Sequence, residues 1–311
     1  MSTLSYLQSV TIGLLQGVTE LFPVSSLGHS VLVPAWIGGS WADLVTQGSS
    51  DSSPYLAFIV ALHVATAIAL LIFYRRDWVA IVGGFVTVLR TRKVETSSQR
   101  LAVLIVVATV PVGITGLLLE HSLRNLFAKP LAAAVFLTLN GVILGAGELL
   151  RRRAEHRAPA EHRAPAEHRA PAEAEGVALS APAPRNLETL EYREAAVIGL
   201  FQTFALLAGI SRSGITMVGG LVRGLDHEDA AKLSFLLATP VILAAGVLKL
   251  PTLAGAAGDG IGGQVVVGAI VAGLAAYGSL RFLTRYFATR TLVPFAVYSL
   301  VAGLLSVAHF A

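Results

Sequence analysis

Residues 55–74 read YLAFIVALHVATAIALLIFY, a run of twenty residues without Asp, Glu, Lys or Arg. A helix of about 20 apolar residues crosses a hydrocarbon core of roughly 30 Å. Five more apolar runs of similar length follow, with at most one charged residue each, at residues 101–119, 130–149, 233–250, 264–284 and 293–310. The sequence therefore predicts an all-α integral membrane protein with six transmembrane helices.

The composition of the whole chain supports this class. Of its 311 residues, 54% are hydrophobic and 14% are charged, against roughly 25% charged residues in soluble domains. The mean hydropathy of +0.70 argues against a soluble enzyme, a nucleic-acid-binding module and a disordered protein. The absence of cysteine excludes disulfides, thiolate nucleophiles, zinc fingers and iron–sulfur clusters. The pI near 9.6 indicates basic cytoplasmic loops rather than a nucleic-acid partner.

Two further apolar regions, residues 4–37 and 195–225, are broken by short polar turns near residues 23–26 and 209–214. Backbone groups exposed to lipid at such a break would cost several kcal/mol each. The turns must therefore be buried in protein or line a cavity. We interpret each region as a re-entrant helical hairpin.

The two hairpin regions resemble each other. Residues 11–30 and 197–216 share seven of twenty identities, including Gln16 with Gln202 and Ser25 with Ser211. Chance similarity between Leu/Gly-rich membrane segments is the alternative, but the shared polar residues favour an internal duplication.

Basic residues predict the topology. If the segment 75–100 is cytoplasmic, 19 of the 23 basic residues lie inside. The hairpins then enter from opposite sides, as an inverted-topology repeat whose tips meet near the membrane midplane. The predicted halves are residues 1–150 and 194–311.

Residues 151–193 form a polar insert between the halves. The segment from 151 to 194 holds 16 of the 42 charged residues of the chain. Within the insert, Glu-His-Arg-Ala-Pro-Ala occurs three times, from residue 155 to 172. Three evenly spaced histidines could bind a metal, but a flexible cytoplasmic linker is the better reading of this Pro/Ala-rich composition.

The first break gathers several reactive side chains. Gln16 and Glu20 are four residues apart and share a helix face, and Ser25, Ser26 and His29 follow at the start of the next short helix. Ionisable groups inside a membrane are costly and are functional candidates by default. A buried polar network that only holds the helix break together is the alternative.

The second break places Arg212 between Ser211 and Ser213, with Thr216 one turn later. A buried arginine needs an anion. That anion is either Glu20, in a structural ion pair, or a phosphate of a ligand, which guanidinium and hydroxyl groups bind well. The residues alone indicate a site for phosphoryl-ester chemistry or for anion binding during transport. His63, inside the run 55–74, could face this site, but we expect a core histidine bonded to a carbonyl.

At this point the sequence resembles a known family. The stretch from Gln16 to His29, with its Pro-Val-Ser-Ser-Leu-Gly-His ending, looks like the first motif of the undecaprenyl-diphosphate phosphatases, the bacitracin-resistance membrane phosphatases. The segment Gly-Ile-Ser-Arg-Ser-Gly-Ile-Thr, residues 209–216, looks like their second motif, and residues 234–240 resemble the segment that follows it. Three positions depart from the usual pattern: Leu27 replaces a threonine, Ala208 replaces a proline, and Gln16 stands where many members have glutamate.

The resemblance implies hydrolysis of undecaprenyl diphosphate to the monophosphate, which recycles the lipid carrier for cell-wall synthesis and confers bacitracin resistance. It also implies a multi-pass protein of the bacterial plasma membrane, with its site open to the extracytoplasmic side. On this reading Glu20 and Gln16 would hold a divalent cation, Mg²⁺ or Ca²⁺. The expected catalytic residues are Glu20, Ser26, His29 and Arg212, and the expected phosphate ligands are Ser25, Ser211, Arg212, Ser213 and Thr216.

The sequence leaves several points open. The nucleophile could be Ser26, His29 or water, and the oligomeric state, including a homodimer, is not determined. A transporter is the competing class, since inverted repeats and a midplane anion site also describe secondary carriers. Among transporters, a polyprenyl-phosphate flippase that uses the same anion site fits these features best.

Overall fold

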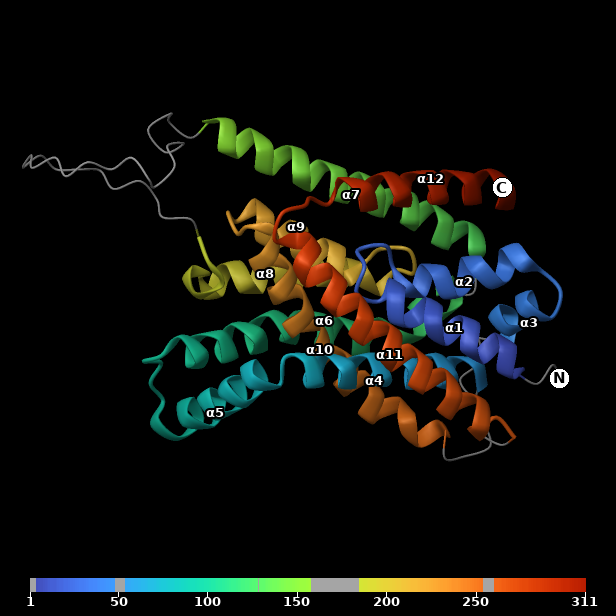
Figure 1. Cartoon of the computed structure of the whole chain (residues 1–311), viewed down its shortest axis with the longest axis horizontal. Helices are drawn as coiled ribbons and strands as arrows, with labels where there is room; N and C mark the ends of the chain where they lie inside the picture. Colours follow the sequence, from blue (N-terminus) through green and yellow to red (C-terminus); the bar gives the residue numbers. More distant parts are fainter. Residues whose placement is uncertain (1–3, 48–53, 128, 158–184, 254–259) are drawn as a thin grey trace, which may run out of the picture.

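The computed structural model describes residues 4–47, 54–127, 129–157, 185–253 and 260–311 (Figure 1). Within these ranges the chain is helical, apart from turns and an isolated β-bridge between Arg185 and Leu225. The three Glu-His-Arg-Ala-Pro-Ala copies fall almost entirely outside the described residues, so the prediction of a flexible linker is not tested.

Six helices of the described chain are long and apolar enough to cross a membrane, which confirms the six predicted spans. Several of them extend beyond the apolar runs, because a helix continues through polar residues once its hydrogen bonds propagate. For example, the helix around the run 101–119 extends from residue 97 to residue 127. The six helices are α4 (Pro54–Phe73), α6 (Ser97–Phe127), α7 (Pro130–Arg157), α10 (His227–Leu253), α11 (Gly262–Phe287) and α12 (Val293–Phe310).

Two further helices were not expected from the sequence. Helix α5 (Arg75–Thr91) occupies most of the segment between the first two spans. That segment was expected to be a loop. The helix was missed because its uncharged stretch, residues 78–89, is much shorter than the roughly 20 residues expected of a span. The short helix α3 (Ser40–Gln47) lies beyond the first hairpin region.

The two broken regions each form short helical segments separated by a turn. The first consists of α1 (Tyr6–Thr19) and α2 (Ser26–Ile37), and the second of α8 (Tyr192–Gln202), the 3₁₀ turn η4 (Thr203–Leu206) and α9 (Arg212–Val222). In Figure 1, α1 and α2 lie toward the end of the molecule that holds both termini, and α8 and α9 toward the end where the insert leaves. The helix breaks are therefore present as predicted. Their re-entry into a membrane and the inverted repeat stay predictions.

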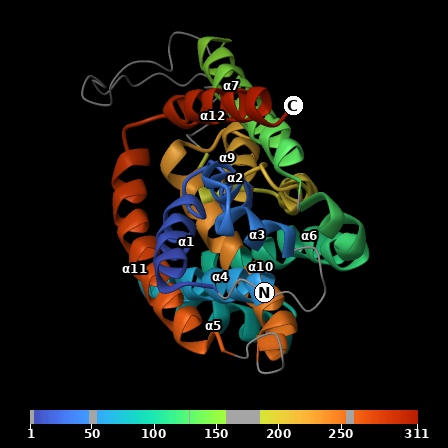
Figure 2. The ribbon, with the colours of Figure 1, turned by 90° about the vertical axis from the view of Figure 1, so that its right-hand side faces the viewer.

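Helix α1 is held in the interior by a close approach to α11. A Cβ atom added at Gly17 would lie 2.3 Å from the carbonyl oxygen of Ala272, and one at Gly13 would lie 2.5 Å from that of Gly268. Only glycine permits this backbone contact. Viewed end-on, α1, α2 and α9 lie inside a ring of the long helices (Figure 2). This packing brings the two breaks to the centre of the molecule.

Candidate active site

The first break has a strained backbone. Helix α1 ends at Thr19, four residues before Pro23, which cannot continue a helix. Ser25 has a φ of +70°, a conformation that costs a non-glycine residue on the order of 1–3 kcal/mol. Its hydroxyl caps α2 by accepting a hydrogen bond from the Gly28 amide at 3.2 Å. Such strain persists only where the surrounding contacts hold it in place.

Those contacts come from the second break. The Ser25 hydroxyl also accepts a hydrogen bond from the Gly209 amide at 3.1 Å. A Cβ added at Gly28 would lie 2.9 Å from the Cα of Gly209, so the two turns touch through their glycines. Asn140 of α7 joins them as well, donating to the Pro23 carbonyl at 3.0 Å and accepting from the Ser211 amide at 2.9 Å. The structure thus brings together two breaks that lie about 190 residues apart in the sequence.

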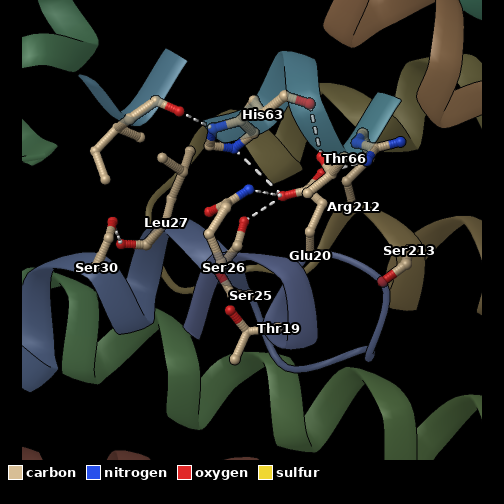
Figure 3. Close-up of polar contacts among 12 residues, drawn as sticks. Thr19, Glu20, Ser25, Ser26, Leu27, Ser30, His63, Thr66, Arg212 and Ser213 are labelled. Atoms are coloured by element: carbon tan, nitrogen blue, oxygen red, sulfur yellow. Dashed lines mark hydrogen bonds and ion pairs between the residues drawn. The ribbon is translucent and has the colours of Figure 1, made fainter. Parts of the chain in front are cut away.

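Glu20 is the centre of the polar contacts between the breaks (Figure 3). Its Oε1 atom accepts a hydrogen bond from Arg212 Nη2 at 2.6 Å. Its Oε2 atom accepts hydrogen bonds from Ser26 Oγ and from Gln16 Nε2, the latter at 3.1 Å. The carboxylate is 7% exposed, which makes this a buried ion pair between the two halves of the chain.

His63 of α4 is the fourth partner of this carboxylate. Its Nε2 atom lies 3.3 Å from Glu20 Oε2, and its Nδ1 atom lies 2.8 Å from the Ile59 carbonyl oxygen. A carboxylate and a carbonyl only accept hydrogen bonds, so a His63 ring that donates to both is the imidazolium. In that form His63 places a second cation beside Glu20, in addition to the Arg212 guanidinium.

A cavity of about 330 Å³ opens from this cluster. Its polar lining includes Glu20, Ser25, Ser26, His63, Gln202, Ser211 and Arg212. The rest of the wall is largely apolar and comes from α4, α6, η4, α10 and neighbouring segments, including Leu56, Ile59, Val60, Val112, Leu206, Ile210, Val241, Ile242 and Ala245. The cavity therefore suits a ligand with a charged head and a hydrocarbon tail.

Three buried polar atoms near the cavity have no hydrogen-bond partner among the described residues: Arg212 Nη1, Gln16 Oε1 and Gln202 Oε1. Arg212 and Gln202 line the cavity, whereas Gln16 lies behind Glu20. A buried polar group without a partner costs free energy, so each such atom needs an explanation. A bound ligand would supply the missing partners.

Five of the predicted site residues line the cavity together: Glu20, Ser25, Ser26, Ser211 and Arg212. The others are adjacent and engaged elsewhere. His29, expected beside Glu20, has its Nδ1 atom 2.7 Å from the Ser25 carbonyl oxygen and its Nε2 atom 2.7 Å from the Tyr298 hydroxyl. Ser213 bonds to the Ser211 hydroxyl at 2.9 Å, and Thr216 donates to the Arg212 carbonyl at 2.8 Å.

Sequence reasoning gave no role to Asn140 and Gln202, and for His63 it preferred a core position over the site. His63 does bond a carbonyl, as expected, but its other nitrogen faces Glu20. Asn140 lies in the middle of the run 130–149, and a polar residue inside a span is a signal that could have marked it. Gln202 matches Gln16 in the repeat alignment but was given no role.

Comparison with known proteins agrees with this geometry. A family model described as bacitracin resistance protein BacA matches residues 9–305. The chain belongs to this family. It is 62% identical to undecaprenyl-diphosphatase 2 of Frankia alni, over 100% of this chain and 99% of the relative. It is 56% identical to the undecaprenyl-diphosphatase of Mycolicibacterium paratuberculosis and 41% identical to that of Granulibacter bethesdensis, with at least 95% of each chain covered.

Proposed function

We propose that this member of the family is an undecaprenyl-diphosphatase, which hydrolyses undecaprenyl diphosphate to undecaprenyl phosphate and inorganic phosphate. One observation carries the proposal: a buried carboxylate is paired with an arginine and lies beside a histidine, at the polar end of a cavity whose remaining wall is largely apolar. A lipid diphosphate has the matching chemistry, with a charged head and a prenyl tail. The names of the relatives favour this enzyme over the carrier considered from the sequence.

The charges of the cluster favour an anion. With His63 protonated, Arg212 and His63 contribute two positive charges against the single negative charge of Glu20. Arg212 uses Nη2 for Glu20, which leaves Nη1 for a phosphate oxygen. The first amides of α9 have no partner within the helix, and the helix N-terminus adds positive potential beside Ser211. Together these groups would hold a diphosphate and stabilise charge that develops during phosphoryl transfer.

Ser26 is our candidate nucleophile. Its hydroxyl donates to Glu20 Oε2, the contact through which a carboxylate takes a hydroxyl proton as the nucleophile attacks. Ser26 Oγ would bond to the terminal phosphorus, and the bond from that phosphorus to the bridging oxygen would break. The electron pair would stay on undecaprenyl phosphate, the leaving group, which would also take the serine proton from Glu20 and leave the carboxylate ionised for the next step. Water would then release inorganic phosphate from the serine.

A divalent cation fits the donor set. Mg²⁺ and Ca²⁺ prefer oxygen ligands, and Mg²⁺ is commonly bound by one or two carboxylates together with substrate phosphates. Glu20 supplies a carboxylate, and the neighbouring Gln16 Oε1 atom is buried without a partner among the described residues. These two residues would hold the ion, which would neutralise and polarise the diphosphate.

The proposed setting follows from the family and the charge distribution. We place the chain in the bacterial plasma membrane, with α1–α2 and α8–α9 as opposed re-entrant hairpins and the site open to the extracytoplasmic side. Nineteen basic residues then lie on the cytoplasmic side. Recycling the lipid carrier there would support peptidoglycan synthesis and confer bacitracin resistance.

The enzyme is tested with purified protein in detergent and undecaprenyl diphosphate. We expect repeated turnover to equal amounts of undecaprenyl phosphate and inorganic phosphate. A chelator should stop the reaction, and added Mg²⁺ or Ca²⁺ should restore it. Translocation of the lipid in vesicles without phosphate release would instead identify a carrier.

The role of Ser26 has a separate test. Ser26→Ala is expected to lower kcat by on the order of 10³-fold or more, because it removes the attacking oxygen. Quenched reactions of the wild type should also contain phosphoserine at position 26, detected by mass spectrometry. Turnover of the alanine variant within tenfold of wild type would show that Ser26 is only a phosphate ligand.

A further inference from the structure

Gln202 is a polar residue of the cavity that the scheme above does not use. It is the last residue of α8, its side chain is fully buried, and it lines the same cavity as Ser26, Glu20 and Arg212. Its Nε2 atom donates to the Ala108 carbonyl oxygen of α6 at 3.2 Å. Its Oε1 atom has no partner among the described residues.

The orientation of this amide is set by its surroundings. Ala108 offers a carbonyl oxygen, which accepts hydrogen bonds, so the NH₂ group must face it and Oε1 must point the other way. The backbone also fixes the position of the residue. A Cβ added at Gly199 would lie 2.4 Å from the same carbonyl oxygen, so α8 packs directly on α6 at this level. Gln202 thus brings to the wall of the cavity a buried acceptor that cannot turn into a donor without losing a bond.

An acceptor is the wrong group for a phosphate anion, which also accepts hydrogen bonds. Its partner must bring a proton, and hydrolysis requires one such molecule, water. We propose, on the basis of the function proposed above, that Gln202 Oε1 holds the water molecule whose oxygen ends in inorganic phosphate. Glutamine side chains orient the attacking water in this way in other phosphoryl-transfer enzymes.

The step balances with the residues of the cavity. The water oxygen bonds to phosphorus, and the bond from phosphorus to Ser26 Oγ breaks with its electron pair staying on the serine oxygen. One water proton stays on the inorganic phosphate. The other returns to Ser26 Oγ by way of the Glu20 carboxylate, which regenerates the hydroxyl. Gln202 takes no proton and acts through the direction of its hydrogen bond.

Methanol distinguishes this role from a structural one. Water has two protons, so it can donate to Gln202 and to the base at the same time. Methanol has one and cannot do both. The wild type should therefore transfer the phosphoryl group to water in preference to methanol. In a variant without the Gln202 oxygen, this preference for water should fall by about tenfold, the effect of one hydrogen bond.

The experiment uses the full-length protein in detergent, with undecaprenyl diphosphate, Mg²⁺ and a few per cent methanol. Inorganic phosphate and methyl phosphate are quantified by ³¹P NMR for the wild type, Gln202→Leu and the unbranched Gln202→Met. We expect kcat to fall by about tenfold with little change in KM, and the ratio of methyl phosphate to inorganic phosphate to rise by about tenfold. Thr203→Val is the matched control, because Thr203 bonds the Leu200 carbonyl at the same helix end without lining the cavity.

Each other outcome overturns the assignment. Equal loss of both products at an unchanged ratio would mean that Gln202 only braces α8 against α6. A higher Mg²⁺ requirement at an unchanged ratio would make it a cation ligand. The inference is also wrong if neither the wild type nor either Gln202 variant forms methyl phosphate. If the wild type releases no phosphate at all, the proposed function fails first, and the inference fails with it.

Discussion

Replacing Glu20 by alanine or glutamine is expected to lower the rate of phosphate release by about 10³-fold, the scale of losing a catalytic acid–base group. The carboxylate accepts from Ser26, balances Arg212 and His63, and is our candidate cation ligand. Glutamine keeps the shape but removes the negative charge, so it cannot take the serine proton. The measurement is kcat with undecaprenyl diphosphate at saturating Mg²⁺.

Stability must be measured beside activity, because breaking a buried ion pair costs about 3–5 kcal/mol. A protonated His63 can release its proton when Glu20 is neutralised, which limits the loss of stability. Glu148→Gln is the matched control. Glu148 is an equally buried carboxylate that contacts His227 at 2.9 Å and Arg152 at 3.3 Å, outside the cavity. We expect the control to lose thermal stability but keep its turnover. Equal turnover of the Glu20 variants and the wild type would remove Glu20 from the mechanism.

Replacing Arg212 is the second change with a large expected effect. Arg212→Ala should lower kcat by about 10³-fold, the magnitude seen for arginines that stabilise a phosphoryl transition state. Arg212→Lys keeps the charge, but one ammonium group cannot hold Glu20 and a phosphate oxygen in the planar arrangement of a guanidinium. We therefore expect the lysine variant to stay at least tenfold below wild type.

Arg185→Lys controls for the general cost of this substitution. Arg185 holds Glu194 through two nitrogen atoms, at 2.8 and 2.9 Å, and does not line the cavity. Its lysine variant should keep normal kinetics. If Arg212→Lys hydrolyses the substrate as fast as the wild type, a positive charge alone suffices at this position. The proposal that Nη2 holds Glu20 while Nη1 holds a phosphate oxygen is then wrong.

The membrane spans could be predicted because each leaves a continuous apolar run in the sequence. Helix α5 could not, since its uncharged stretch, residues 78–89, is too short to cross a membrane. In the structure this helix packs against α6. The breaks were visible for a different reason. Pro23 and the Gly209–Gly214 segment interrupt otherwise apolar helices, and the polar residues beside them would be unfavourable if they were exposed to lipid.

The composition of the site was harder to predict than its place. Ser26 and His29 lie three residues apart on α2, yet Ser26 reaches Glu20 while His29 contacts Tyr298 of α12. Nothing in the local spacing specifies the partner helix, which is a tertiary contact across 269 residues. His63 shows the reverse case. Its carbonyl bond is local and predictable, but the contact with Glu20 depends on how α4 packs against α1.

The central claim is that the two helix breaks build one site for diphosphate hydrolysis. The initial rate of inorganic phosphate release from undecaprenyl diphosphate tests it most directly. Wild type, Glu20→Ala, Arg212→Ala and the two control variants are measured in the same detergent. We expect turnover by the wild type and both controls, and rates near background for the two site variants. A wild-type rate no higher than that of the site variants would contradict the claim.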